Sequence, residues 1–196
     1  MKTKTITIYS AKELSPEAQE KAWSDWQVTA DYAWTEDNRN TLKAFEDIFP
    51  VKVKDYEYGY RKNIDWRFTA DDKIEVLSGA RLAKYLHNNY ATRIFKRKYI
   101  GHLNEKEKYT PVYSKCQVET SCVLTGYCID DDILAPVYAF LKKPKKSVTF
   151  SDLMGDCLES WLSACEADYE ACQSLEYFID HADATEYEFL ETGERA

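Results

Sequence analysis

Glycine and proline are scarce in this sequence, with six and five residues among 196. Aromatic residues make up 14% of the chain and hydrophobic residues 44%. Disordered chains have the opposite composition, so this scarcity excludes a largely disordered protein. A chain of this length can bury a substantial core without disulfides. We therefore expect one globular domain over residues 1–196.

Long hydrophobic runs are missing too. No stretch approaches the ~18 apolar residues of a membrane-spanning helix. Residues 1–10 contain no apolar core of the length that a signal peptide needs. We therefore expect a cytoplasmic protein.

The cysteines lack the spacing of a metal site. None of the six belongs to a CxxC or CxxH pair, which excludes a zinc knuckle. We interpret them as buried free thiols that act as small hydrophobic residues. A metal or redox role is the alternative.

Catalytic motifs are also absent. The three histidines, His87, His102 and His181, belong to no recognisable motif, and no phosphate-binding, nucleophile-elbow or zinc-protease signature occurs. The run of acids at 130–132 would suit a divalent metal, but acids at the start of a helix explain it more simply. We expect no enzyme, no cofactor and no metal.

Charge is present in quantity but unevenly placed. Residues 51–110 carry 14 basic and 8 acidic side chains, whereas residues 147–196 carry 1 basic and 13 acidic side chains. The whole chain has a net charge of −8. Such asymmetry bears on binding partners rather than on the fold.

Hydrophobic periodicity indicates helices and strands that do not alternate regularly, which favours α+β. The clearest helix start is Ser15 followed by Pro16, a good N-cap and a good first residue. We expect a mixed or antiparallel sheet packed against several helices, with a long acidic C-terminal helix. The predicted helices cover about 16–29, 36–49, 78–90, 130–141 and 149–181. The predicted strands cover 3–9, 51–58, 64–68 and 185–190, with one or two more within 116–127 and no regular element over 91–110.

The predicted helix over 149–181 has an unusual polar face. It begins near Ser151, which we interpret as its cap, and its apolar face collects leucine, cysteine and Trp161. Its acids fall within roughly 80° of arc and span about 27 Å. No lysine or arginine lies in the helix to neutralise them. These candidate partner-binding residues, which we call the acidic row, are Asp152, Asp156, Glu159, Glu166 and Glu170.

Two interpretations of the acidic row stay open. It is a solvated face that aids solubility, or it docks on a basic partner. In the second case a row of carboxylates would occupy a groove built for nucleic-acid phosphates, because such grooves work largely by electrostatics.

The basic middle of the chain is a second candidate site. Its basic side chains stand among aromatic residues, a combination that grips single-stranded nucleic acid through phosphate contacts and stacking. The same side chains would equally pair with the protein's own acidic helix. They are Arg61, Lys62, Arg67, Arg93, Lys96, Arg97 and Lys98.

Both ends of the chain show a resemblance. The segment from Tyr9 to Ala22, with Glu13-Leu14-Ser15 before a tryptophan-containing helix, resembles the start of a family of small bacteriophage and prophage proteins. The segment 186–193 resembles the closing strand and turn of that family. Its members are mostly uncharacterised, and some carry a loose antitoxin label. The resemblance implies an accessory phage gene and transfers no catalytic residue.

These observations lead to one expected function and two alternatives. The first is a phage-encoded, non-enzymatic binding protein that inhibits a host defence system of the CRISPR or restriction type through the acidic row. The second is an antitoxin-like or regulatory protein that binds a partner protein through other faces. The third is a single-stranded nucleic-acid-binding module that uses the basic middle.

Overall fold

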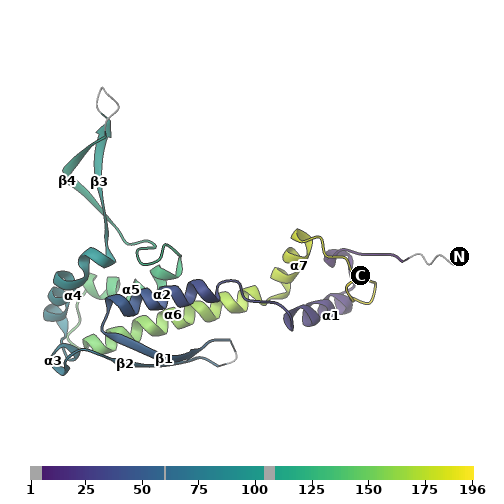
Figure 1. Cartoon of the computed structure of the whole chain (residues 1–196), viewed down its shortest axis with the longest axis horizontal. Coiled ribbons are helices and arrows are strands. Elements are labelled where there is room, and N and C mark those ends of the chain that lie inside the picture. Colours follow the sequence, from purple (N-terminus) through teal and green to yellow (C-terminus); the bar gives the residue numbers. More distant parts are fainter. Residues whose placement is uncertain (1–5, 60, 104–108) are drawn as a thin grey trace. The chain divides into compact units, whose positions relative to one another are not determined.

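The computed structural model describes residues 6–59, 61–103 and 109–196 (Figure 1). These residues form seven α-helices, one short 3-10 helix and two antiparallel sheets of two strands each. The α+β class is thereby confirmed. Contacts divide the chain into a larger unit, Trp34–Glu166, and a smaller unit, Met1–Ala33 with Ala167–Ala196. The expectation of a single domain stays a prediction.

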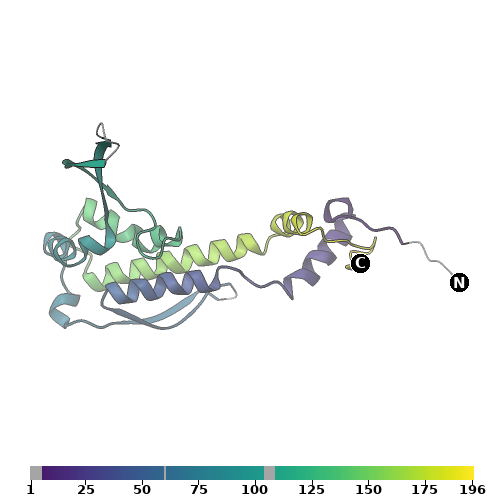
Figure 2. The same ribbon diagram turned by 45° about the horizontal axis from the view of Figure 1, so that its top comes forward.

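The larger unit contains most of the regular structure. In Figure 2, α2 runs alongside α6. In the first hairpin Val51 lies opposite Phe68, and in the second Lys96 lies opposite Glu119. The elements of this unit are α2 (Thr35–Ile48), β1 (Val51–Glu57), β2 (Asn63–Phe68), α3 (Asp72–Glu75), α4 (Gly79–Ile94), β3 (Lys96–Leu103), β4 (Tyr109–Glu119), α5 (Ile129–Lys142) and most of α6 (Phe150–Cys172).

The core of the larger unit is made by its four long helices. Phe45 of α2, Leu86 of α4, Leu134 of α5 and Trp161 of α6 are all fully buried. The first hairpin packs partly buried residues such as Trp66 against this core. Burial of apolar surface on this scale is the main source of stability in a domain.

A proline lies within α5 and its effect is compensated. Pro136 has no backbone N–H, so the carbonyl oxygen of Asp132 four residues earlier lacks its helical donor. The hydroxyl of Ser160 on α6 donates to that oxygen at 2.7 Å. A side chain of the neighbouring helix therefore supplies the hydrogen bond that the proline removes.

The smaller unit joins the two ends of the chain. It contains η1 (Ala11–Glu13), α1 (Pro16–Gln27), the last residues of α6, and α7 (Leu175–Ala184). Tyr9 and Phe189 exchange two backbone hydrogen bonds of 2.9 Å. Its core is small and consists of Ala11, Leu14, Ala18, Ala22, Phe178, Ala182 and Phe189.

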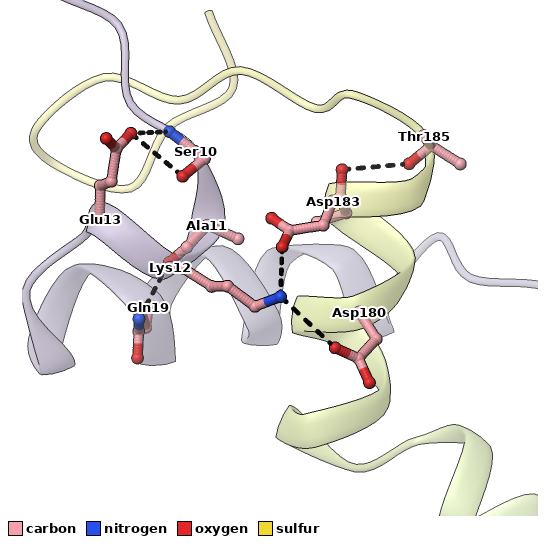
Figure 3. Close-up of polar contacts among 9 residues, drawn as sticks. Ser10, Ala11, Lys12, Glu13, Gln19, Asp180, Asp183 and Thr185 are labelled. Carbon is pink, nitrogen blue, oxygen red and sulfur yellow. Dashed lines mark hydrogen bonds and ion pairs between the residues drawn. The ribbon is translucent and has the colours of Figure 1, made fainter.

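Polar contacts fasten the N-terminal segment to α7 in this unit (Figure 3). The carboxylate of Glu13 accepts hydrogen bonds from the backbone and hydroxyl of Ser10, which lower the pKa of Glu13. Lys12 pairs with Asp183 and lies 3.7 Å from Asp180. These contacts lie at the surface, where ion pairs contribute little stability.

A close backbone approach closes the smaller unit. Gly193 has a φ of +82°, and a Cβ atom built on it would lie 2.2 Å from the carbonyl oxygen of Ala18. Only glycine has neither the side chain that would clash nor the strain of a positive φ. The turn near the C-terminus therefore requires glycine here.

Most predicted elements are confirmed. The helix after Ser15 begins at Pro16, and the Ser15 hydroxyl accepts the N–H of Ala18 at 3.3 Å. The helices predicted over 36–49, 78–90 and 130–141 and the hairpin over 51–68 are present with small changes of boundary.

The long C-terminal helix was predicted wrongly as one element. It ends at Cys172, and α7 begins after Ser174. The backbone of Ser174 is extended and its hydroxyl accepts the N–H of Tyr177 at 3.2 Å, so Ser174 caps a new helix. Hydrophobic periodicity continued across the break and concealed it.

The strand predictions were less accurate. Residues 96–103, predicted without regular structure, form β3, and β4 begins at Tyr109 rather than within 116–127. Within 6–9 and 185–190 the structure has isolated bridges at Tyr9 and Phe189 instead of strands. Residues 3–5 of the first predicted strand lie outside the described residues.

Candidate functional site: the acidic face of helix α6

The direction of the acidic row is set by the opposite face of α6. Met154, Cys157, Leu158, Trp161 and Cys165 are all fully buried. Their spacing of three and four residues places them on one side of the helix. The acids occupy the other side, where Asp152, Asp156, Glu159 and Glu170 are exposed and Glu166 is half-buried.

Asp152 forms hydrogen bonds with Thr149 at the start of α6. Its carboxylate accepts the N–H of Thr149 at 3.0 Å, while the Thr149 hydroxyl accepts the N–H of Asp152 at 3.1 Å. This reciprocal pair is a capping box, and it lowers the pKa of Asp152. Thr149 rather than Ser151 is therefore the cap residue, which corrects the sequence interpretation. Asp152 has a structural role at the helix end.

Glu159 and Glu166 are bridged by one lysine. Lys62, from the turn between β1 and β2, places its Nζ atom 3.4 Å from Glu159 and 3.2 Å from Glu166. The same atom donates to the hydroxyl of Ser163 at 2.7 Å. The hydrogen bond with Glu166 is the main cause of a raised pKa at Lys62. Part of the basic middle thus neutralises part of the acidic row within the larger unit.

The remaining two acids of the row differ in their surroundings. Asp156 is exposed and lines a surface hollow of about 480 Å³ that also borders Lys143 and Lys145. Glu170 is exposed and belongs to the smaller unit. Among the described residues, Lys62 is the one cation paired with an acid of α6. Within the larger unit the exposed carboxylates of the row are therefore Asp152 at the helix start, Asp156 and Glu159.

The candidate nucleic-acid residues come from two different hairpins and from α4. Arg61 and Arg67 are exposed, but Arg93 donates to the carbonyl of Asp47 at 3.2 Å, and Lys96 donates to that of Cys122 at 2.7 Å. The side chains of Arg97 and Lys98 lie outside the described residues; their backbones pair with Val118 and Gln117 of β4.

Three described aromatic residues among these basic side chains, Tyr56, Tyr58 and Phe95, pack against the core. The rings of Tyr56 and Tyr58 meet Trp161 edge-on, with centroids 4.9 and 6.3 Å away. Phe95 packs against Tyr138 with centroids 5.5 Å apart. These rings are half-buried and contribute to the packing of the larger unit. The structure therefore gives less support to the nucleic-acid interpretation of residues 51–99.

The acids at 130–132 organise a loop. Asp130 is fully buried, and its carboxylate accepts five hydrogen bonds. The donors are the backbone N–H groups of Leu124, Thr125 and Gly126 and the hydroxyls of Thr41 and Thr125. The described residues contain no cluster of three or more side chains suited to hold a metal ion. The network explains Asp130 without one.

The network around Asp130 is the feature that sequence reasoning missed. The triplet lies in the first turn of α5, as the sequence indicates, and Asp130 in addition gathers donors from the preceding loop. Thr125 and Gly126, five and four residues before Asp130, are the local signal, because such residues favour turns. The hydroxyl of Thr41 comes from α2 and has no local signal.

Comparison with known proteins adds no further constraint on this site. No family model, no curated protein and no solved structure matches the chain. In the described part of the chain, no helix is both long enough and apolar enough to cross a membrane.

Proposed function

We propose that this chain is a non-enzymatic binding protein of phage origin that acts in the bacterial cytoplasm and inhibits a host defence nuclease. Carboxylates on the exposed face of α6 would contact the basic surface with which that nuclease holds nucleic acid. The observation that carries the proposal is the division of α6 into a fully buried apolar face and an acidic face that contains no basic residue of its own.

The geometry of the helix favours such a contact. Because α6 is anchored by its buried face, the acids need little further ordering when a partner binds, and this lowers the entropic cost of association. Several carboxylates on one side of a rigid helix also attract a basic surface over a distance and raise the rate of encounter.

Lys62 acts as an internal competitor in this proposal. It occupies Glu159 and Glu166, which a basic partner would otherwise contact directly. Lys62→Gln should therefore strengthen binding to a basic partner. If the basic middle is the binding surface, the same substitution should weaken binding to nucleic acid, so the direction of the change separates the two functions.

The proposal is tested with purified restriction and CRISPR nucleases, by measuring DNA cleavage at increasing concentrations of the full chain. We expect inhibition of at least one enzyme, with excess duplex DNA relieving it. The triple variant Asp156→Lys, Glu159→Lys, Glu166→Lys should raise the inhibitory concentration by about tenfold or more, equivalent to ~1.4 kcal/mol.

A matched control makes the same change of net charge elsewhere. The variant Glu17→Lys, Glu20→Lys, Asp25→Lys alters three exposed acids of α1. It should retain most of the inhibition. Equal loss in the two triple variants would indicate a general effect of net charge, and inhibition unaffected by the α6 variant would remove the acidic row from the mechanism.

A further inference from the structure

Two cysteines lie at the ends of the loop that connects β4 to α5. Cys122 is half-buried, Cys128 is exposed, and both are free thiols. Only five residues separate them. Cys122 has a φ of +48°, in the left-handed region that residues other than glycine seldom adopt. The loop therefore holds Cys122 in a strained conformation, which requires strong local contacts.

One residue provides those contacts to both cysteines. The N–H of Cys122 donates to the carboxylate of Asp131 at 2.6 Å, and the N–H of Asp131 donates to the carbonyl of Cys128 at 2.9 Å. Ser121 adds a hydrogen bond of 3.0 Å to the same carboxylate, and its hydroxyl lies 3.5 Å from the Cys122 sulfur. Asp131 thus brings the two ends of the loop together.

The rest of the loop is fixed by the buried carboxylate of Asp130, which accepts N–H groups from Leu124, Thr125 and Gly126. A fixed loop with adjacent ends keeps the two cysteines near each other, and the Cys122 thiol lies close enough to raise the pKa of the Cys128 thiol.

The other described cysteines have different surroundings. Cys157 and Cys165 are fully buried, and burial raises the pKa of the Cys157 thiol. Cys172 is half-buried on α6, in the smaller unit. Buried thiols are inert because neither a thiolate nor a reagent reaches them. Among the described cysteines, Cys128 of the loop pair is therefore the one with an exposed thiol.

The neighbours of Cys128 raise the pKa of its thiol. Cys122 contributes most, desolvation follows, and Asp131 and Asp132 add to the shift. Cys128 is the more exposed of the two thiols, so a small disulfide reaches it first.

We propose that Cys122 and Cys128 are a redox-sensitive pair that a low-molecular-weight disulfide converts to an intrachain disulfide. The Cys128 thiolate attacks the small disulfide, forms a mixed disulfide and releases one small thiol. The Cys122 thiolate then attacks the Cys128 sulfur and releases the second small thiol. The two protein thiols lose two electrons and two protons, and the small disulfide gains both. This site is independent of the acidic row.

Oxidised glutathione is the probe for the experiment. The full chain, first reduced, is incubated with defined ratios of oxidised to reduced glutathione, and free thiols are then alkylated under native conditions. Peptide mass spectrometry should find Cys122 linked to Cys128 with a loss of two mass units. Cys157 and Cys165 should become alkylated only after unfolding.

Single variants identify the partners. Cys122→Ser and Cys128→Ser should each remove the link and leave glutathione attached to the remaining loop cysteine. Cys116→Ser and Cys172→Ser should leave the link intact. Loss of the link in either of the last two variants, or glutathione on both loop cysteines without a link, would overturn the proposal.

Asp131→Asn keeps the N–H that contacts Cys128 but weakens the acceptor for Cys122. It should lower the yield of the link at a fixed glutathione ratio by several fold, without removing it. An unchanged yield would contradict the positioning role of Asp131. The formation of the disulfide itself is tested separately by the cysteine variants.

Discussion

The smaller and the larger unit differ in how they carry charge. The smaller unit holds 14 acidic and 5 basic residues in 63 positions, whereas the larger holds 20 acidic and 21 basic residues in 133. The net charge of −8 is therefore a property of the smaller unit. The acidic row begins in the balanced unit, where Lys62 already meets two of its members. Total charge alone does not locate a binding surface.

The two units also differ in what stabilises them. The larger unit packs four long helices around a continuous core. Its buried carboxylate, Asp130, accepts five hydrogen bonds. The smaller unit has seven buried core residues and depends on a close backbone approach at Gly193. Different substitutions should therefore destabilise each unit.

The largest effect is expected at Asp130 in the larger unit. Asp130→Ala leaves three backbone N–H groups and two hydroxyls without their acceptor, and should lower the free energy of unfolding by about 3 kcal/mol or more. Urea denaturation followed by circular dichroism measures this change. The neighbouring variant Asp132→Ala, at an exposed position, is the control and should have little effect. Similar losses in both variants would contradict the role of the network.

The next effect is expected at Gly193 in the smaller unit. Gly193→Ala introduces both a strained φ and a clash with the carbonyl of Ala18, and should destabilise this unit by about 2 kcal/mol. Hydrogen exchange should rise in residues 6–33 and 175–196 and stay unchanged in the core of the larger unit.

Gly126→Ala is the matched control for this substitution. Gly126 also has a positive φ, +97°, but a Cβ atom there would meet nothing within 4 Å. It carries the strain without the clash, so its cost should be smaller. If both variants cost the same, the close approach contributes nothing beyond backbone strain.

A smaller effect is expected at the start of α6. Thr149→Ala removes the cap and should cost about 1 kcal/mol in thermal or urea unfolding. Ser151→Ala, at the residue that the sequence suggested as the cap, should be nearly neutral. A larger loss of stability in Ser151→Ala than in Thr149→Ala would indicate that Ser151 is the cap residue.

The same capping box should depend on pH through Asp152. Because the pKa of Asp152 is lower when folded, its ionised form stabilises the fold above the ordinary carboxyl pKa of about 3.9. That contribution is lost as the pH falls through the lowered value. Asp152→Asn should therefore be less stable than the parent chain at pH 7 and equal to it near pH 2.

The smallest effect is expected at the surface ion pairs of the smaller unit. Lys12→Gln removes the contacts with Asp180 and Asp183, both at the surface. Any loss of stability should disappear in 0.5 M NaCl, because salt screens exposed pairs. A loss that persists at high salt would show that Lys12 contributes by packing.

Local signals in the sequence predicted the fold class and most helices. Ser15 and Pro16 mark a helix start by chemistry that needs no distant contact. Ser174 was missed because a serine within an amphipathic pattern looks like a helical residue until its backbone extends. The direction of the acidic row was predictable, since periodicity alone defines the two faces of α6.

The ion pairs between Lys62 and the acidic row were not predictable from the sequence. Lys62 is separated from Glu159 by almost a hundred residues, and no pattern in the sequence pairs them. Sequence alone leaves open whether the acidic and basic regions meet, and the structure shows that they do at Lys62. The packing of Tyr56 and Tyr58 on Trp161 is likewise a tertiary contact, so the sequence does not indicate that those rings point toward the core.

The hydrogen bond between Ser160 and the carbonyl of Asp132 has a consequence for how this chain tolerates change. Pro136 is acceptable in α5 because a residue 24 positions later supplies the missing donor. A lineage that loses Ser160 while it keeps Pro136 leaves a polar atom unpaired, whereas one that replaces both keeps an ordinary helix. The two positions should therefore be inherited as a pair, and substitution at one should make substitution at the other more acceptable.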